Sequence, residues 1–159
     1  MADILTPEQR RVCMSHVKSQ NTSLEMKVRR GLHSYGMRYT LHDGNLAGKP
    51  DLVFSRHKVA LFVHGCFWHR HGCYKSTLPA TRQDFWLGKF EKNILRDQKN
   101  IALLTTSGWR VLIIWECALT GPHRQPFCLL LDDAARFILK QSASILELSG
   151  IPRTEKSFY

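Results

Sequence analysis

The densest group of reactive side chains lies between residues 65 and 73, in the sequence GCFWHRHGC. Thiolate and imidazole are the ligands that zinc prefers in tetrahedral sites. Cys66, His71 and Cys73 could supply three ligands, and Cys117, which follows a predicted buried strand, is the natural candidate for the fourth. The same spacing also fits free cysteines beside surface histidines, or a disulfide between the two loop cysteines. The sequence therefore favours a structural zinc site but leaves these two alternatives open.

A second set of side chains could bind a hard metal ion or transfer protons. Asp51 opens a predicted strand, and a carboxylate there is well placed to bind Mg²⁺, which prefers oxygen ligands. His64 ends the next strand, and His69 lies in the loop that follows. Asp97 lies near the apolar side of a long predicted helix, where a histidine would be a fitting partner, because an Asp that orients a His tunes it as a general base.

Each of these signals has an ordinary structural explanation as well. A Pro-Asp pair such as the one that ends in Asp51 usually forms a turn. Asp97 could be solvated or paired with the neighbouring Arg96 or Lys99. Glu25 stands three residues after Thr22, and this spacing is typical of a helix capping box.

Aromatic side chains accompany the possible metal ligands. Phe67 and Trp68 are adjacent in the loop, and Trp86 lies near the start of the long predicted helix. Neighbouring residues in a loop rarely both point inward, so we expect at least one large ring to be exposed. Exposed rings on a cationic protein could unstack a base step of DNA. The alternative is that the rings cover the metal site as a small satellite core.

Composition limits the class of protein. The 159 residues suggest a single domain, and 23 lysines and arginines against 13 acids give a formal charge of +10, which favours a polyanionic partner over a merely basic surface. No apolar run approaches the ~20 residues of a membrane span, and the N-terminus lacks an apolar signal core. We therefore expect a cytoplasmic protein with no membrane partner, in which Cys13 and Cys128 are buried or half-buried thiols.

Periodicity and capping signals predict an α/β layer with a central mixed sheet flanked by helices. Thr6, Pro7 and Gln9 begin one helix, and Leu24 and Val28 mark the inner face of the next. The first 20 residues would form a helical arm and residues from about 150 to 159 a tail. We expect helices over about 7–18, 22–36, 81–108 and 126–140, and strands over 37–42, 51–54, 58–64 and 109–115.

Taken together, these stretches resemble the very-short-patch-repair (Vsr) mismatch endonuclease family. The most specific part is HGCFWHRHGC at 64–73 followed by WECAL at 115–119, and the similarity spans roughly residues 12 to 120 in order. It also includes MSHV at 14–17 with Thr22 and Glu25, GKPD at 48–51, PAT at 79–81, FW at 85–86, KN at 92–93 with RD at 96–97, and GWRV at 108–111.

The resemblance implies a restriction-endonuclease-like core and a Mg²⁺-dependent enzyme that nicks one DNA strand 5′ of the thymine in a T:G mismatch. Such a mismatch arises when 5-methylcytosine deaminates, and the nick begins very short patch repair. The expected partner is double-stranded DNA with that mismatch. Mismatch-repair factors and a repair polymerase are further expected partners of a monomeric, nucleoid-associated bacterial protein.

The resemblance also implies roles for individual residues. Asp51 and the backbone carbonyl of Val63 would bind Mg²⁺, and His69 would be the general base. The other catalytic residues would be His64, Asp97 and Glu25. The zinc ligands would be Cys66, His71, Cys73 and Cys117. The DNA-intercalating residues would be Phe67, Trp68, Trp86 and Met14.

The chain departs from the family pattern at Val63, where the family more often has threonine. It also lacks the second acid and the lysine of common restriction-type nucleases, so catalysis must depend on histidine. The rivals are a zinc-stabilised DNA-binding module without catalysis and a less selective nuclease of the same fold. A thiol oxidoreductase is poorly supported, since the sequence has no C-x-x-C motif.

Overall fold

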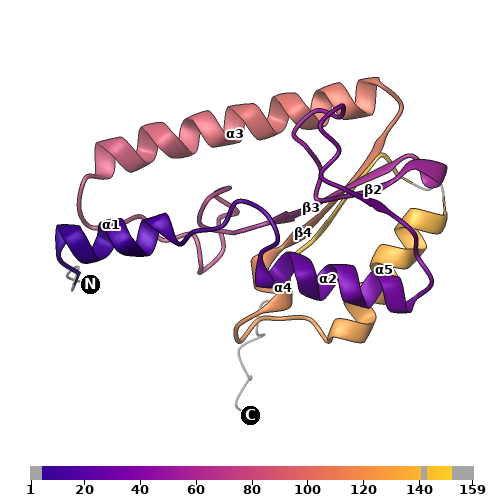
Figure 1. Ribbon diagram of the computed structural model, residues 1–159, viewed down its shortest axis with the longest axis horizontal. Coiled ribbons are helices and arrows are strands. Elements are labelled where there is room, and N and C mark those ends of the chain that lie inside the picture. Colours follow the sequence, from indigo (N-terminus) through magenta and orange to yellow (C-terminus); the bar gives the residue numbers. More distant parts are fainter. Residues whose placement is uncertain (1–4, 141–142, 152–159) are drawn as a thin grey trace, which may run out of the picture.

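A computed structural model of the chain describes residues 5–140 and 143–151. A five-stranded sheet lies between helices, with strand order β1-β2-β3-β4-β5 (Figure 1). In the described part of the chain, no helix is both long enough and apolar enough to cross a membrane. The elements are α1 (Pro7–Ser15), α2 (Ser23–Ser34), β1 (Thr40–Leu41), β2 (Leu52–Phe54), the 3₁₀ turn η1 (Ser55–His57), β3 (Val59–His64), α3 (Gln83–Thr106), β4 (Arg110–Trp115), α4 (Glu116–Leu119), α5 (Phe127–Leu139) and β5 (Ile145–Leu148).

The sheet is mixed, as the sequence predicts. β2 pairs antiparallel with β1 and β3, while β4 runs parallel to both β3 and β5. Parallel neighbours need crossover connections, which α3 and α5 provide. In the register of the parallel pair, His64 lies opposite Trp115. The carboxyl ends of β3 and β4 therefore lie side by side, and the chain leaves them into the cysteine-rich loop and α4.

Two apolar layers cover the two faces of the sheet. Side chains alternate along a strand, so Val59 and Leu61 of β3 pack with residues of α2 and α5, while Ala60 and Phe62 pack on the α3 side. Figure 1 shows α2 and α5 on one face of the sheet and the long α3 on the other. His64 follows in the alternation, and its ring contacts the ring of Phe62, which brings it to the α3 face.

Three sequence predictions need correction in the first part of the chain. The first helix ends at Ser15 rather than near residue 18, and none of its side chains is buried, so no packing extends it. The strand predicted over 37–42 is reduced to Thr40–Leu41, because the Met37 N–H bonds to the Leu32 carbonyl and ends α2. Cys13 is an exposed thiol rather than a buried or half-buried one, as is Cys128 farther along the chain.

The C-terminal part also differs from its prediction. β5 was not predicted, because ILEL is short and its pairing comes from β4. The expected tail is anchored at its start: the Gly150 N–H donates to Cys117 Sγ (3.2 Å) and the Ile151 N–H to the His123 carbonyl (2.8 Å). The rest of the predicted tail, 152–159, and the first four residues of the predicted arm lie outside the described residues.

Candidate active site and metal centres

The loop after β3 carries His69 to the α3 face of the sheet. Turns in the loop are closed by hydrogen bonds from the His69 N–H to the Gly65 carbonyl (3.1 Å) and from the His71 N–H to the Cys66 carbonyl (3.2 Å). His69 Nδ1 then lies 2.5 Å from Oδ2 of Asp97 on α3. This short hydrogen bond leaves Nε2 of His69 as the ring nitrogen free to exchange a proton.

His64 supports this pair from the end of β3. Its ring stacks on that of His69 at a centroid distance of 3.7 Å and an angle of 2°. Burial lowers the pKa of His64 to about 3, so the ring is neutral at physiological pH. Burial opposes ionisation of Asp97, but the His69 hydrogen bond and nearby positive charge outweigh it and lower the pKa of the carboxyl. A charged Asp97 therefore orients a histidine that rests on a neutral ring.

Asp51 lies immediately before β2 and faces the end of β3. Its Oδ2 accepts the N–H of Val63 at 2.7 Å. The N–H and C=O of one strand residue point to the same side, so this geometry directs the Val63 carbonyl toward the same edge. Burial raises the pKa of Asp51 to about 6, against the effect of the Val63 hydrogen bond. A desolvated carboxylate beside a backbone carbonyl fits the oxygen ligands that Mg²⁺ prefers.

Behind Asp51 lies a buried polar cluster that the sequence analysis did not foresee. Glu25 and Arg29 form an ion pair within α2, and each side chain is less than a tenth exposed. His42 lies between this pair and Asp51, with Nε2 3.0 Å from Glu25 Oε1 and Nδ1 4.0 Å from Asp51 Oδ1. Glu25 also caps α2 locally, since its Oε2 accepts the Asn21 N–H at 2.9 Å. Glu25 is thus both a helix-start acid and a part of the site.

One cavity of about 590 Å³ unites the two groups of side chains. Its lining includes His42, Asp51 and Val63 together with His64, His69 and Asp97. Lys49, Arg96 and Asn100 complete the wall with polar groups that suit a phosphate.

The four predicted zinc ligands meet on the other side of the loop. The ligand atoms of Cys66, His71, Cys73 and Cys117 all lie within 4.8 Å of one another. α4 follows β4 directly and returns Cys117 to the loop, where its Sγ lies 3.4 Å from His71 Nδ1. Burial raises the pKa values of the Cys66 and Cys117 thiols and lowers that of His71. Three cysteine sulfurs, which bind zinc as thiolates, and one neutral imidazole are the donor set of a closed structural zinc site.

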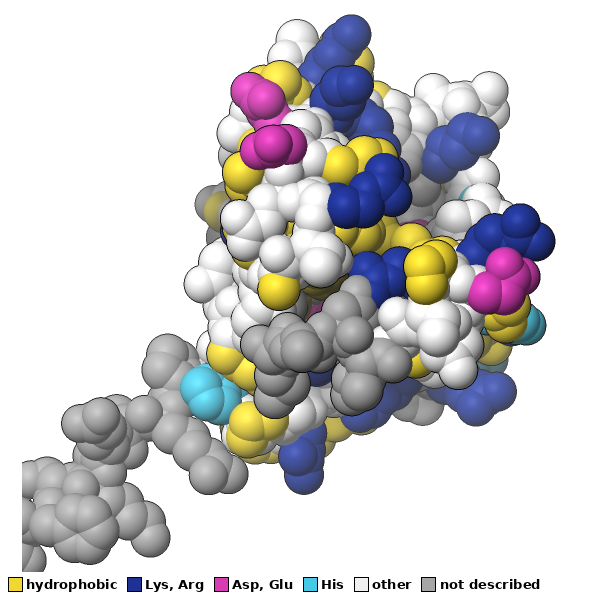
Figure 2. Space-filling view, turned by 90° about the vertical axis from the view of Figure 1, so that its left-hand side faces the viewer, with side chains coloured by type: hydrophobic (Ala, Val, Ile, Leu, Met, Phe, Trp, Pro, Cys, Tyr) yellow, Lys and Arg dark blue, Asp and Glu magenta, His cyan; other side chains and the backbone are white. Residues whose placement is uncertain are grey.

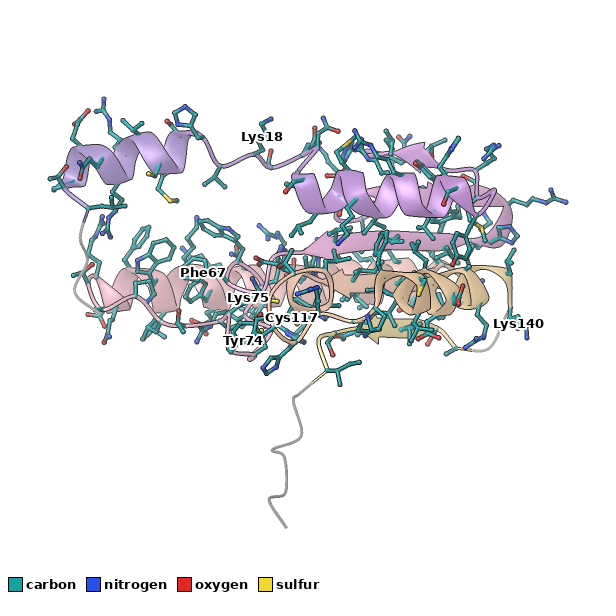
Figure 3. The ribbon with its side chains drawn as sticks, turned by 90° about the horizontal axis from the view of Figure 1, so that it is seen from below. Lys18, Phe67, Tyr74, Lys75, Cys117 and Lys140 are labelled. Carbon is teal, nitrogen blue, oxygen red and sulfur yellow. The ribbon has the colours of Figure 1, made fainter. Side chains whose placement is uncertain are left out.

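The aromatic side chains form one cluster near His69. The Phe67 ring lies 5.1 Å from the Trp68 and Phe90 rings and 5.3 Å from the Trp86 ring, measured between centroids. Phe67, Trp68 and Trp86 are half-buried because they pack on one another and on Phe90, so the expectation of an exposed ring in the loop was wrong, whereas Met14 is exposed on α1. Figure 3 shows Phe67 beside α3, with α1 running along the opposite side of an open space.

A second hollow, of about 680 Å³, adjoins the first cavity and reaches Trp68 of the aromatic cluster. Lys18 and Trp68 line it, and His69 and Arg96 line both hollows. Figure 2 shows Lys and Arg side chains interspersed with hydrophobic ones at this end of the molecule. Cations and aromatic rings along one path match the two chemical components of DNA, its phosphates and its bases.

Comparison with known proteins places the chain in a family. Residues 2–75 match the model of the family described as DNA mismatch endonuclease Vsr. The chain is 38% identical to the DNA mismatch endonuclease Vsr of Escherichia coli (strain K12) over 152 residues. These aligned residues cover 95% of this chain and 97% of that protein. The chain belongs to the Vsr family.

Two further relatives are named as nicking enzymes. The type II nicking enzyme V.XorIIP of Xanthomonas oryzae pv. oryzae is 50% identical over 120 residues, which cover 76% of this chain and 88% of that protein. The type II nicking enzyme V.NmeAIP of Neisseria meningitidis serogroup A is 43% identical over 119 residues, which cover 75% of this chain and 85% of that protein. This Vsr protein is accordingly a DNA endonuclease of mismatch repair, and a restriction-endonuclease-like fold agrees with its mixed sheet.

Trp115 is a further site residue that the sequence analysis noted only as part of a motif. Its ring stacks on His71 at 4.3 Å between centroids and meets the edge of His64 at 5.3 Å. The indole N–H donates to Oε2 of Glu147 on β5 at 2.8 Å. One buried side chain of this Vsr protein thus contacts both His71 of the cysteine cluster and His64 of the candidate active site.

Proposed function

We propose that the protein nicks one strand of double-stranded DNA 5′ of the thymine in a T:G mismatch, by Mg²⁺-dependent hydrolysis of a phosphodiester. The observation that carries this proposal is the single cavity in which a desolvated Asp51 faces the His69–Asp97 pair. Two relatives are named as nicking enzymes, which supports cleavage of one strand. The nick would begin the repair of deaminated 5-methylcytosine.

Proton transfer falls to His69 in this proposal. Asp97 holds Nδ1, so Nε2 can take the proton of the attacking water while the carboxylate stabilises the imidazolium that forms. His64 limits the motion of the ring by stacking on it. Arg96 and Lys49 would bind the phosphates on either side of the scissile bond.

Asp51 and the carbonyl of Val63 would hold the magnesium. When bound, Mg²⁺ supplies positive charge next to the phosphate oxygens, where negative charge develops during hydrolysis. Because only the carbonyl of residue 63 would be used, a valine serves there as well as a threonine. Zinc would occupy the cluster of Cys66, His71, Cys73 and Cys117 and stabilise the loop that carries His69.

Mismatch recognition would use the aromatic cluster as a wedge. Unstacking costs least where bases are mispaired, so insertion of Phe67, Trp68 or Trp86 would favour the mismatch. α1 with Met14 would approach the DNA from the opposite side, and the basic hollow would guide the strand to the cavity. We expect the protein to act as a monomer. Mismatch-repair factors and a repair polymerase would act on the DNA after the nick.

Strand nicking of a labelled duplex tests the proposal. The substrate carries one T:G pair, the control a T:A pair, and Mg²⁺ is present or withheld. We expect a cut immediately 5′ of the mispaired thymine that requires Mg²⁺ and is lost in Asp51→Ala and in His69→Ala. Cutting that survives His69→Ala would remove the general-base role. Binding without cutting in several sequence contexts would support a non-catalytic DNA-binding protein instead.

A further inference from the structure

The hydrogen atoms of Arg29 determine how the His42 ring is oriented in the buried cluster. Nη2 of a guanidinium carries two hydrogens, and here it lies 2.7 Å from Asn21 Oδ1 and in contact with Glu25 Oε1. Both hydrogens are therefore used. His42 Nε2 lies 2.8 Å from the same nitrogen and 3.0 Å from Glu25 Oε1, so the favourable arrangement has Nε2–H donating to Glu25.

A histidine that binds a metal is neutral, and with Nε2–H directed at Glu25 the lone pair of such a ring lies on the other nitrogen. This atom, Nδ1, lies 4.0 Å from Oδ1 of Asp51, the carboxylate oxygen that does not accept the Val63 N–H. The distance is too long for a hydrogen bond. It is short enough for one divalent ion to lie between the two atoms with bonds of about 2.1 Å to each. The cavity reaches both side chains.

The surroundings of His42 hold its ring in place without a metal. Glu25 is 2% exposed and Arg29 is 8% exposed, so the acid that fixes Nε2 is itself held within the protein. The backbone at His42 has a positive φ of 48°, and its N–H donates to the Asp51 carbonyl (3.4 Å). A carboxylate that holds one nitrogen of an imidazole while the other faces a metal is the usual environment of a metal-binding histidine.

We propose that His42 Nδ1 is a direct ligand of the divalent ion at Asp51, with Glu25 and Arg29 as positioning residues. This inference rests on the proposed function, since it concerns the same ion. A nitrogen ligand changes the selectivity of the site. Mg²⁺ prefers oxygen, whereas first-row transition ions such as Co²⁺ and Mn²⁺ accept imidazole. The site should therefore bind these ions more tightly than a site built only from Asp51 and a carbonyl.

Metal binding by zinc-saturated protein tests the inference directly. We would titrate Co²⁺ and Mg²⁺ by calorimetry into wild type, His42→Gln and the matched control His33→Gln, an exposed histidine on α2. Gln keeps a donor for Glu25 but replaces the ring nitrogen with an amide. We expect Co²⁺ to bind His42→Gln at least about tenfold more weakly, with less than a twofold change for Mg²⁺ and none in the control.

Pulsed electron paramagnetic resonance of bound Mn²⁺ gives a second readout. We expect imidazole nitrogen coupling in wild type and its absence in His42→Gln. Equal losses of Co²⁺ and Mg²⁺ affinity, or no nitrogen coupling in a wild type that nicks with Mg²⁺, would overturn the role of His42 and leave the proposed function intact. Unchanged metal binding in Asp51→Asn, together with nicking that needs no Mg²⁺, would overturn both.

Discussion

The two clusters of metal-ligand side chains in this protein differ in access to solvent. Cys66 and Cys117 of the cysteine cluster are 0% and 2% exposed, and backbone N–H groups already contact both sulfurs. Asp51 and His69 are 18% and 21% exposed, and both line an open cavity. A closed set of soft ligands is typical of a structural site, whereas an open site with hard ligands leaves coordination positions for a substrate.

The two clusters also differ in how much they destabilise the folded protein when no metal ion is bound. Burial raises the pKa values of the Cys66 and Cys117 thiols, so without a metal these two buried groups are held in their neutral form. Asp51 is penalised when ionised, because burial, together with the nearby Glu25, raises its pKa to about 6. We therefore expect substitutions in the cysteine cluster to lower stability, and substitution of Asp51 to abolish activity without lowering stability.

The largest effect should follow from loss of a cysteine ligand. We predict that Cys117→Ser destabilises the fold by several kcal/mol and lowers the melting temperature by more than about 10 °C, because the energy of zinc binding contributes to folding. Thermal melts with measured zinc content check this. Cys128→Ser, an exposed thiol, is the matched control and should melt like wild type. Equal melting temperatures for both variants would show that the cluster does not stabilise the fold.

Asp51→Asn should have opposite effects on activity and stability. We expect nicking to be lost, while stability rises by about 1–3 kcal/mol above pH 6 because a charge that is costly to bury is removed. The sign follows from the raised pKa of Asp51: its penalty is absent below about pH 4, grows as the carboxyl ionises and is complete above about 6. Denaturant unfolding between pH 5 and 8, measured without a metal ion at Asp51, gives the free energy of unfolding that checks this. Asp43→Asn is the control. A variant less stable than wild type at pH 7.5 would contradict it.

A smaller loss is expected at Asp97. We predict that Asp97→Asn lowers the nicking rate by about 10²–10⁴ with little change in DNA affinity, because the amide no longer orients and stabilises His69 as an imidazolium. Single-turnover nicking and binding assays separate the two quantities. Asp133→Asn, on α5, should behave like wild type. A loss of affinity that accounts for the whole loss of rate would assign Asp97 to DNA binding instead.

The smallest effect should come from Glu147, which anchors the tryptophan shared by the two clusters. Glu147→Gln keeps an acceptor for the Trp115 N–H, while Glu147→Leu removes it. We expect the Leu variant to lose about 1 kcal/mol of stability and the Gln variant much less. Tryptophan fluorescence and denaturant unfolding measure this difference. If the two variants lose stability equally, the hydrogen bond is not the cause.

Sequence reasoning reached the local features and the motif-bearing residues. The buried run in β3 and the long α3 could be predicted from the periodicity of neighbouring residues. The four clustered ligands could be predicted from their side-chain chemistry, and Cys117 from its place after a predicted buried strand. β5 and the start of the C-terminal segment could not, since their pairing with β4 and Cys117 is long-range. His42 and Arg29 were missed for the same reason: no spacing links residues that meet only after β1 and α2 pack.

Metal content and nicking measured on the same samples test the division between the two clusters most directly. Wild type and Asp51→Asn would be purified in parallel, analysed for zinc and assayed on the T:G duplex over a Mg²⁺ titration. We predict one zinc per chain in both proteins, with Mg²⁺-dependent nicking only in wild type. Mg²⁺-dependent nicking by Asp51→Asn, or zinc lost together with that side chain, would contradict the account.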